Sequence, residues 1–228
     1  MGLLQSHARR AAGLGQQYGL KMDSPADDGA SVWRLSLADF RDATAANRPT
    51  PGCGAAAAVV SDIGLALVLK GLRISEARGS EPTRRRLLYQ AESLIGRPGA
   101  FADADIRAFR NYLQASRDDA GDLQTASRQA CAVPLATAHS CLEALKLASE
   151  AWPLVAMVVR SDVQAGALLI HAGLSAALIN VDADMASLDD AAAREQAGRS
   201  RERLQTDADK VLRQLLDQAE ADNPSDHA

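Results

Sequence analysis

The chain has 228 residues, of which 47% are hydrophobic and 4% aromatic, and its formal net charge is −4. A weakly acidic chain with one short basic cluster, Arg84 to Arg86, lacks the concentrated positive surface that a nucleic-acid backbone requires, so no nucleic-acid partner is expected. Its three cysteines have no CxxC spacing and suggest neither a disulfide framework nor a zinc site. The cysteine pattern and the lack of an apolar leader at the N-terminus together predict a cytoplasmic protein.

The composition favours an all-α fold. Alanine and leucine supply much of the apolar content, whereas the β-branched and aromatic residues that favour strands are sparse. Residues 1–31 mix Gly, Ser, Pro and Asp without a period and predict a flexible N-terminal extension. Residues 32–221 are expected to form one helical domain, and residues 222–228 have the polar composition of a frayed terminus.

The first predicted helix opens with Ser36 as its N-cap and places Leu37, Phe40 and Ala43 on one face. Residues 47–52, rich in Pro and Gly, end it. Three further helices are predicted between the two long apolar segments described next. They are expected at residues 81–96, 103–116 after a break at 97–99, and 123–151, where Pro134 should kink or divide the element.

Two long segments, residues 54–72 and 161–181, are apolar almost all round, which is typical of helices buried in the centre of a bundle. They are expected to lie side by side. Asp62 and Lys70 interrupt the first segment, argue against a membrane span, and should each need a partner if buried. Because this much apolar surface needs more cover than one protomer offers, a homodimer is expected. Residues 188–221 predict a long amphipathic helix on the outside.

A glycine-containing corner precedes the first apolar helix. Pro51, Gly52, Cys53 and Gly54 stand where the first helical amides are unpaired, so they can form a cradle for an anion or a carbonyl. The alternative is an ordinary tight turn between helices. Cys53 is also a candidate nucleophile at a helix N-terminus, although no base is evident beside it.

Five short motifs in a fixed order resemble the formiminotetrahydrofolate cyclodeaminase and methenyltetrahydrofolate cyclohydrolase family. Together they span roughly residues 36 to 216 and are far more specific than any one alone. They are the helix at Leu37-Ala38-Asp39-Phe40 with the loop Arg48-Pro49-Thr50-Pro51-Gly52-Cys53-Gly54, the segment Asp105-Ile106-Arg107-Ala108-Phe109, the segment Val133-Pro134-Leu135, the pair Ser161-Asp162, and Asn180-Val181 with the closing Leu188-Asp189-Asp190.

The resemblance implies an all-α homodimer that acts on one-carbon derivatives of tetrahydrofolate without a metal or redox cofactor. Either family reaction needs a proton acceptor or donor beside a carbon that carries two nitrogens, and a carboxylate suits the positive charge of that substrate. Asp105 is the first candidate, and its alternative role is to oppose the dipole in the first turn of its own helix. Asp162 with Ser161 is the second candidate, to shape the pocket floor, and Asn180 is a candidate ligand of the pterin ring.

Several positions depart from the family pattern. Cys53 stands where the loop has a middle glycine, and Asp184 stands where an NVxxN pattern has its second Asn. A lysine-rich motif at the end of the first apolar helix is replaced by residues 73–80, where Arg73 is a candidate substitute for binding an acidic substrate tail. The competing hypothesis is therefore a noncatalytic helical binding or assembly protein that keeps the fold.

Overall fold

The computed structural model describes residues 31–117 and 122–222, and all regular structure in these residues is helical. The all-α prediction is therefore confirmed. The predicted extension, apart from Ser31, and residues 223–228 lie outside the described residues. In chain order the elements are η1 (Val32–Arg34), α2 (Leu37–Ala45), α3 (Cys53–Arg78), α4 (Pro82–Leu94), α5 (Arg97–Ala115), α6 (Leu123–Ala151), η2 (Trp152–Leu154), η3 (Met157–Val159), α7 (Arg160–Met185) and α8 (Ala191–Asp222).

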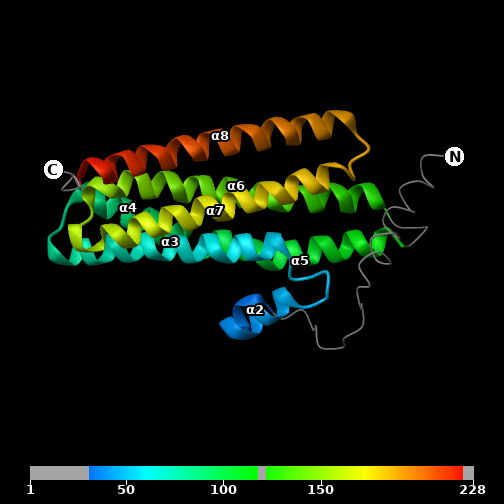
Figure 1. Cartoon of the computed structure of the whole chain (residues 1–228), viewed down its shortest axis with the longest axis horizontal. Helices are drawn as coiled ribbons and strands as arrows, with labels where there is room; N and C mark the ends of the chain where they lie inside the picture. Colours follow the sequence, from blue (N-terminus) through cyan, green and yellow to red (C-terminus); the bar gives the residue numbers. More distant parts are fainter. Residues whose placement is uncertain (1–30, 118–121, 223–228) are drawn as a thin grey trace, which may run out of the picture.

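The long helices run along a common axis (Figure 1). Helix α8 lies along α6 and α7 on one side, α3 and α5 lie on the other side, and α4 packs at the end where α3 finishes. The core is made largely of alanine, leucine and valine side chains from these helices, with Trp152 at one end. Its most completely buried large side chains are Trp152, Leu65, Leu72, Leu87, Leu145, Ile170, Leu174, Leu178, Leu204 and Leu215.

Helices α3 and α7 lie side by side, as predicted, because small residues let their backbones approach closely. A Cβ atom on Gly64 would stand 2.7 Å from the carbonyl oxygen of Gly166, and one on Gly173 would stand 1.9 Å from Oγ of Ser61. Either methyl group would force the helices apart, so these glycines set the packing of the two helices that carry most of the candidate site.

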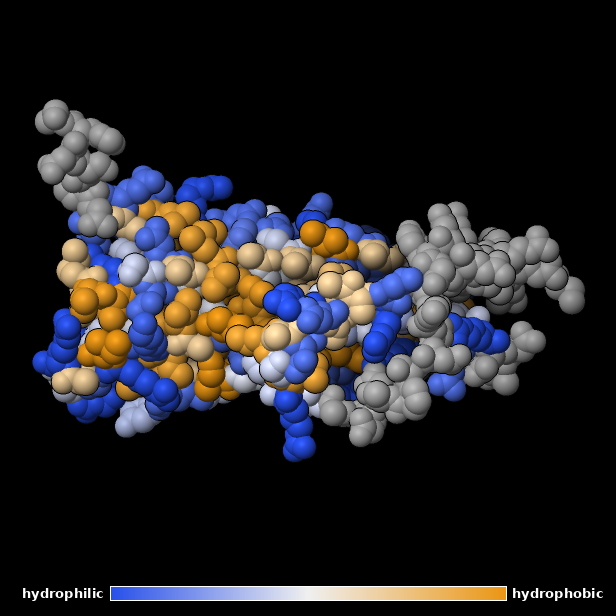
Figure 2. Space-filling view, turned by 60° about the horizontal axis from the view of Figure 1, so that its bottom comes forward, coloured by the Kyte–Doolittle hydropathy of each residue, from blue (hydrophilic) through white to orange (hydrophobic). Residues whose placement is uncertain are grey.

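The α3 and α7 pair leaves a partly apolar surface uncovered. Ile63 of α3 and Leu168 and Ile179 of α7 are exposed, and Figure 2, turned to bring the α2 and α3 side forward, shows hydrophobic residues over much of this face. By length and composition alone, α3 and the segment Met157–Met185 could each span a membrane. Core helices pass the same test, and 67% of the most apolar window of α3 is buried inside the bundle.

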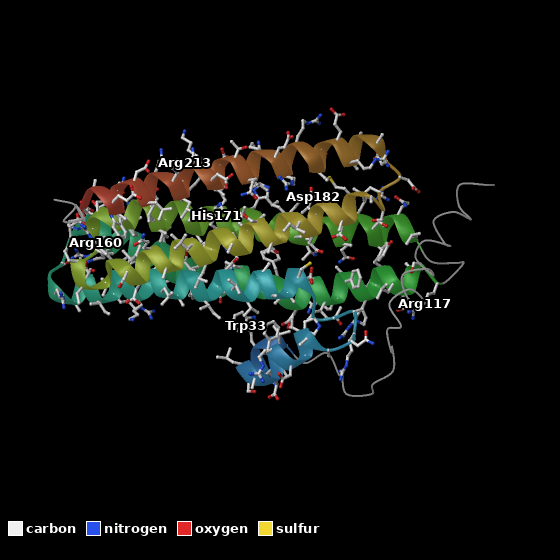
Figure 3. The ribbon with its side chains drawn as sticks, viewed as in Figure 1. Trp33, Arg117, Arg160, His171, Asp182 and Arg213 are labelled. Carbon is white, nitrogen blue, oxygen red and sulfur yellow. The ribbon has the colours of Figure 1, made fainter. Side chains whose placement is uncertain are left out.

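The segment before α3 is fastened to α5. The backbone amide of Val32 donates to Oδ1 of Asp103 at 2.8 Å. The indole Nε1 of Trp33 donates to the carbonyl of Gly99 at 3.0 Å, which places this side chain between the first segment and the bundle (Figure 3). The predicted N-cap of α2 is confirmed, because Oγ of Ser36 accepts from the amide of Asp39 at 3.1 Å.

Helix α5 begins six residues earlier than predicted. The expected break at residues 97–99 is instead its first turn, because Gly96 adopts a left-handed conformation with φ 83° and a proline in a first turn lacks only an amide that would be unpaired there. Asp62 supplies the missing cap from α3: its Oδ1 accepts from the amide of Gly96 at 2.8 Å. The amide of Gly99 also donates to Asp62. These amides are the partners that a buried Asp62 was expected to need.

The other two irregularities of the sequence also have local explanations. Helix α6 is continuous through Pro134, so of the two expected effects of this proline, a kink or a division, the division is wrong. The neighbouring helices hold α6 together at the cost of one amide donor. Lys70 pairs with Asp162 across α3 and α7, with Nζ 2.9 Å from Oδ2.

We predict that Asp62→Ala destabilises the protein by about 1–3 kcal/mol, because it leaves the amide of Gly96 and the amide of the buried Gly99 without their acceptor. Urea unfolding followed by circular dichroism measures the change. Asp62→Asn, which keeps an oxygen acceptor, is the matched control and should lose less. Equal losses in the two variants would contradict the capping role.

Candidate functional site at the start of helix α3

The carboxyl of Asp105 lies against the first turn of α3. Asp105 is 9% exposed, and it accepts a hydrogen bond from the backbone amide of Ala55. A Cβ atom on Gly54 would stand 2.0 Å from Oδ1 of Asp105, so only glycine leaves room for the carboxyl at this position. The predicted cradle is thus occupied by a side chain of the protein itself.

The alternative role of Asp105, to oppose the dipole in the first turn of its own helix, is wrong. Helix α5 begins at Arg97, so Asp105 lies more than two turns inside it. The helix start that Asp105 faces is that of α3, where unpaired amides favour a negative charge.

Asn180 links the three helices of the site. Its Nδ2 donates to Oδ1 of Asp105 at 3.1 Å, and its Oδ1 lies 3.1 Å from Sγ of Cys53, whose thiol donates to it. The structure therefore brings together four of the residues singled out from the sequence, namely Cys53, Gly54, Asp105 and Asn180, from α3, α5 and α7. The two hydrogen bonds engage both polar atoms of the Asn180 amide, so this side chain is held in one orientation.

Burial sets the protonation behaviour of the carboxyls. It raises the pKa of Asp105 to about 6, against the opposing effect of the hydrogen bonds from Ala55 and Asn180. Burial, with the charge of Asp105, raises the pKa of Asp184 to about 7. Both groups therefore change charge near neutral pH, where a general acid or base is most effective.

The thiol of Cys53 is not activated. Burial and the charge of Asp105 raise its pKa above the ordinary value, which keeps it protonated. The candidate role of nucleophile therefore lacks both a lowered pKa and a base, and Cys53 acts here as a hydrogen-bond donor to Asn180.

The loop before α3 is fastened to the helix that carries Asp105. Its Thr50–Pro51 peptide bond is cis. Nε of Arg110 on α5 donates to Oγ1 of Thr50 at 3.3 Å, which ties the loop to α5. Gly52 differs from Gly54 in having space around it, since a Cβ atom on Gly52 would stand 3.7 Å from its nearest neighbour, the carbonyl oxygen of Pro49.

Ser161, Asp162 and Arg73 do not join this site within the chain. Asp162 pairs with Lys70, and Arg73 pairs with Glu92 at 3.0 Å. Figure 3 labels Arg160 and Asp182 near the two ends of α7. At 1.5 Å per residue, the 18 residues between Asp162 and Asn180 span roughly 27 Å. The expectation that Asp162 forms the floor of the Asp105 pocket is therefore not met in the protomer.

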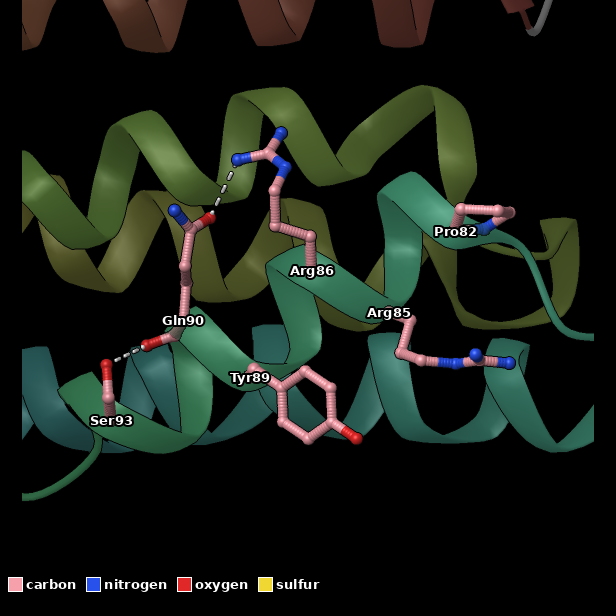
Figure 4. Close-up of a pocket in the computed structure, with 6 residues that line it drawn as sticks. All are labelled: Pro82, Arg85, Arg86, Tyr89, Gln90 and Ser93. Carbon is pink, nitrogen blue, oxygen red and sulfur yellow. Dashed lines mark hydrogen bonds between the residues drawn. The ribbon is translucent and has the colours of Figure 1, made fainter.

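A surface groove with a volume of about 500 Å³ also lies away from Asp105. It follows a single face of α4 (Figure 4). Its lining residues are Pro82, Arg85, Arg86, Tyr89, Gln90 and Ser93. Arg86 is already engaged there, with Nη1 donating to Oε1 of Gln90 at 3.2 Å. A groove along one helix encloses a ligand poorly, so it is a weaker candidate than the buried cluster.

The sequence interpretation missed three residues of this site. Asp184 stands out in the sequence only as a departure from a motif, and neither Tyr112 nor Cys131 belongs to any of the motifs. Burial raises the pKa of Tyr112 and of Cys131, and the charge of Asp184 adds to the rise in both, so Asp184 lies near both groups. Helical spacing was the available signal, because Asn180 and Asp184 are one turn apart, and Asp105 and Tyr112 two turns apart, on the same helix faces.

Comparison with known proteins gives the same family in three ways. The family model described as formiminotransferase-cyclodeaminase matches residues 36–222. A methenyltetrahydrofolate cyclohydrolase from Methylorubrum extorquens is 30% identical over 188 residues, which cover 76% of this chain and 90% of that protein. A formimidoyltransferase-cyclodeaminase from Sus scrofa is 30% identical over 205 residues, which cover 84% of this chain. The match spans 38% of the length of the pig protein.

The fold matches a solved structure as well. The crystal structure of formiminotetrahydrofolate cyclodeaminase from Thermotoga maritima superposes with a TM-score of 0.76 at 24% identity. The match covers 81% of this chain and 96% of that chain. At this identity the similarity concerns the fold.

We predict that Gly54→Ala destabilises the protein by about 1–3 kcal/mol, because the added methyl group overlaps the Asp105 carboxyl and overpacks a tight contact. Gly52→Ala, two residues earlier in a more open position, is the matched control and should change stability little. Thermal unfolding of both variants measures the difference. Tolerance of alanine at both positions would contradict the close approach of Asp105 to α3.

Proposed function

Because the chain belongs to the formiminotransferase-cyclodeaminase family, we propose that it acts on a one-carbon derivative of tetrahydrofolate. The proposed reaction is the hydrolysis of 5,10-methenyltetrahydrofolate to 10-formyltetrahydrofolate, or the related cyclodeaminase reaction. The observation that carries the proposal is the buried carboxyl of Asp105, which is held at the start of α3 beside Asn180 and has its pKa raised to about 6.

The chemistry of either reaction suits this carboxyl. In the hydrolysis, water adds to the cationic methenyl carbon, and the adduct opens as a carbon–nitrogen bond breaks. Asp105 accepts the proton of the attacking water, and its negative charge stabilises the cationic substrate beside it. In the cyclodeaminase reaction a substrate nitrogen attacks the formimino carbon and ammonia leaves, so the same carboxyl accepts the proton of the attacking nitrogen.

The other site residues have supporting roles in this proposal. Asn180 orients the Asp105 carboxyl through its 3.1 Å hydrogen bond. The loop from Pro51 to Gly54 lies at the same end of α3 and would contact the substrate. The parts that Ser161, Asp162 and Arg73 take stay predictions from the family resemblance, since these residues lie toward the other end of α7 and α3. No cofactor is included in the proposal.

The relatives include a cyclohydrolase, matched over 90% of its length, and a cyclodeaminase of the same 30% identity, so the proposal keeps both reactions. The competing hypothesis is a noncatalytic binding or assembly protein of the same fold. It draws on Cys53 in the loop and on the ion pair that Arg73 makes with Glu92, which engages the candidate for binding an acidic substrate tail. An activity measurement separates the two hypotheses.

We also propose that the protein is a homodimer, with the exposed side of α3 and α7 as the contact. Ile63, Leu168 and Ile179 are exposed on these two helices, which bury other residues in the bundle. A second copy would remove these side chains from water through a self-complementary surface.

We predict that the wild-type protein accelerates the loss of the near-ultraviolet absorbance of 5,10-methenyltetrahydrofolate above the spontaneous rate. Asp105→Asn should lower this acceleration about 10²- to 10⁴-fold, since the amide cannot accept a proton. Asp182→Asn, an exposed carboxylate on α7 that pairs with Arg201, is the matched control and should keep the wild-type rate. A wild type without acceleration, tested also for ammonia release from the formimino substrate, would favour the noncatalytic hypothesis.

We predict that Leu168→Lys shifts the protein from dimer to monomer, because it places a charge in the proposed contact between copies. Size-exclusion chromatography with light scattering measures the mass in solution. Tyr89→Lys, at an exposed aromatic on α4, should leave the dimer intact. A wild type that elutes as a monomer, or two variants with the same mass as the wild type, would contradict the proposed contact.

A further inference from the structure

We propose that Asp184 is a second catalytic carboxyl, which shares one proton with Asp105 and delivers it to the nitrogen that leaves the one-carbon unit. This inference rests on the proposed function and adds a residue to it. The family pattern has an asparagine at this position, and an amide can donate a hydrogen bond but cannot give up a proton near neutral pH. An aspartate at the same place can do both.

The position of Asp184 on α7 supports the pairing. Asp184 follows Asn180 by one helical turn, so both side chains project from the same face of α7. Asn180 is bonded to Asp105 across the helix contact. In the part of the chain that the structure describes, no hydrogen-bond donor or ion-pair partner is found for the Asp184 carboxyl. An ionised Asp184 would therefore be a half-buried charge without compensation, which favours its protonated form.

Among the described residues, the titratable groups whose pKa is linked to Asp184 carry no positive charge. One comes from α3, two come from α5 and one comes from α6, and they are Cys53, Asp105, Tyr112 and Cys131. Burial raises the pKa of both thiols and of the phenol, so these three groups are neutral at pH 7. On the α8 side, Arg201 pairs with Asp182 instead, with its Nη2 3.0 Å from Oδ2.

Two neighbouring carboxyls in such surroundings lose their protons in separate steps. Once the first has ionised, its charge makes the second harder to ionise, and the two steps belong to the pair. Because burial raises the pKa of Asp105 to about 6 and that of Asp184 to about 7, the pair passes through a singly protonated state near neutral pH. The singly protonated pair contains a base and an acid at once.

The proton balance of hydrolysis fits this state. A water oxygen bonds to the methenyl carbon, its proton passes to Asp105, and the substrate loses its positive charge. The bond from this carbon to N5 then breaks, and N5 keeps the electron pair and takes the proton of Asp184. The hydroxyl of the adduct returns a proton to Asp184 as the formyl carbonyl forms. Asp105 releases its proton to water, so one proton is produced in each turnover.

The cyclodeaminase reaction uses the same two roles. The formimino group reacts with its nitrogen protonated. N10 bonds to the formimino carbon, and Asp105 takes the proton that N10 loses. Asp184 protonates the amino group, and the bond from carbon to this nitrogen breaks to release ammonia and the methenyl cation. A proton then moves from Asp105 to Asp184 and restores the starting state.

The decisive experiment is the pH dependence of kcat/KM for wild type and Asp184→Asn, between pH 5 and pH 8, after subtraction of the spontaneous reaction. The kcat/KM of the wild type should have a bell-shaped dependence on pH. It should fall on the acid side as Asp105 is protonated and on the alkaline side as Asp184 ionises. Asp184→Asn should lose the alkaline limb, keep the acid limb, and fall at least about 10-fold at the optimum. Asp182→Asn should reproduce the wild-type bell.

The pH dependence of stability tests the shared proton without any activity. The folded pKa of Asp184 lies above the ordinary value, so the folded state keeps a proton that the unfolded state has released. The urea midpoint of the wild type should therefore fall as pH rises from 5 to 8. The urea midpoint of Asp184→Asn should fall less steeply over the same range.

The outcomes distinguish this inference from the proposed function. Identical pH profiles and identical stability slopes for wild type and Asp184→Asn would overturn the role of Asp184 even if the wild type is active. A wild type that accelerates neither reaction would defeat the proposed function and the catalytic role of Asp184 with it. If the wild type is inactive but its urea midpoint falls more steeply with pH than that of Asp184→Asn, the shared proton would still be supported.

Discussion

The contact between the Asp105 carboxyl and the first turn of α3 determines the arrangement of the candidate site. It requires a glycine at position 54, because any side chain there would occupy the place of the carboxyl. It also requires α5 to pass beside the start of α3, which the cap that Asp62 provides for α5 helps to fix. The site is thus a consequence of how two helices cross, and Asn180 adds the third helix to it.

The parts of the fold that depend on local chemistry were predictable from the sequence. Ser36 caps α2 as expected, the apolar pattern places α3 and α7 in long helices, and Trp152 with Pro153 ends α6. The start of α5 was not predictable from local signals, since Arg97-Pro98-Gly99 is typical of a loop. An acceptor from a distant helix, Asp62, makes a first helical turn of it. This cap forms only when α3 packs against α5, so the local sequence around residues 97–99 does not predict it.

The candidate site was predictable to a similar extent. The motifs led to Asp105, Asn180 and the glycine corner, which the structure brings together. They also led to Asp162, whose pairing with Lys70 belongs to the opposite end of the same two helices. A motif gives the order of residues along the chain but not their position along a helix axis of roughly 39 Å, the length of 26 residues. Counting helical turns from Asn180 would have separated Asp162 from the site and added Asp184 to it.

Asp62 and Asp105 show why similar burial leads to different chemistry. Each side chain is 9% exposed and each accepts from amides at the start of a helix, so each has its pKa raised by burial and lowered by those hydrogen bonds. Asp62 receives two backbone amides, from Gly96 and Gly99, and its donors are part of a rigid helix start. Asp105 receives one backbone amide and one side-chain amide, and a second carboxyl stands near it. The carboxyl of Asp62 accepts only from backbone amides and serves as a cap. The carboxyl of Asp105 keeps the capacity to exchange a proton.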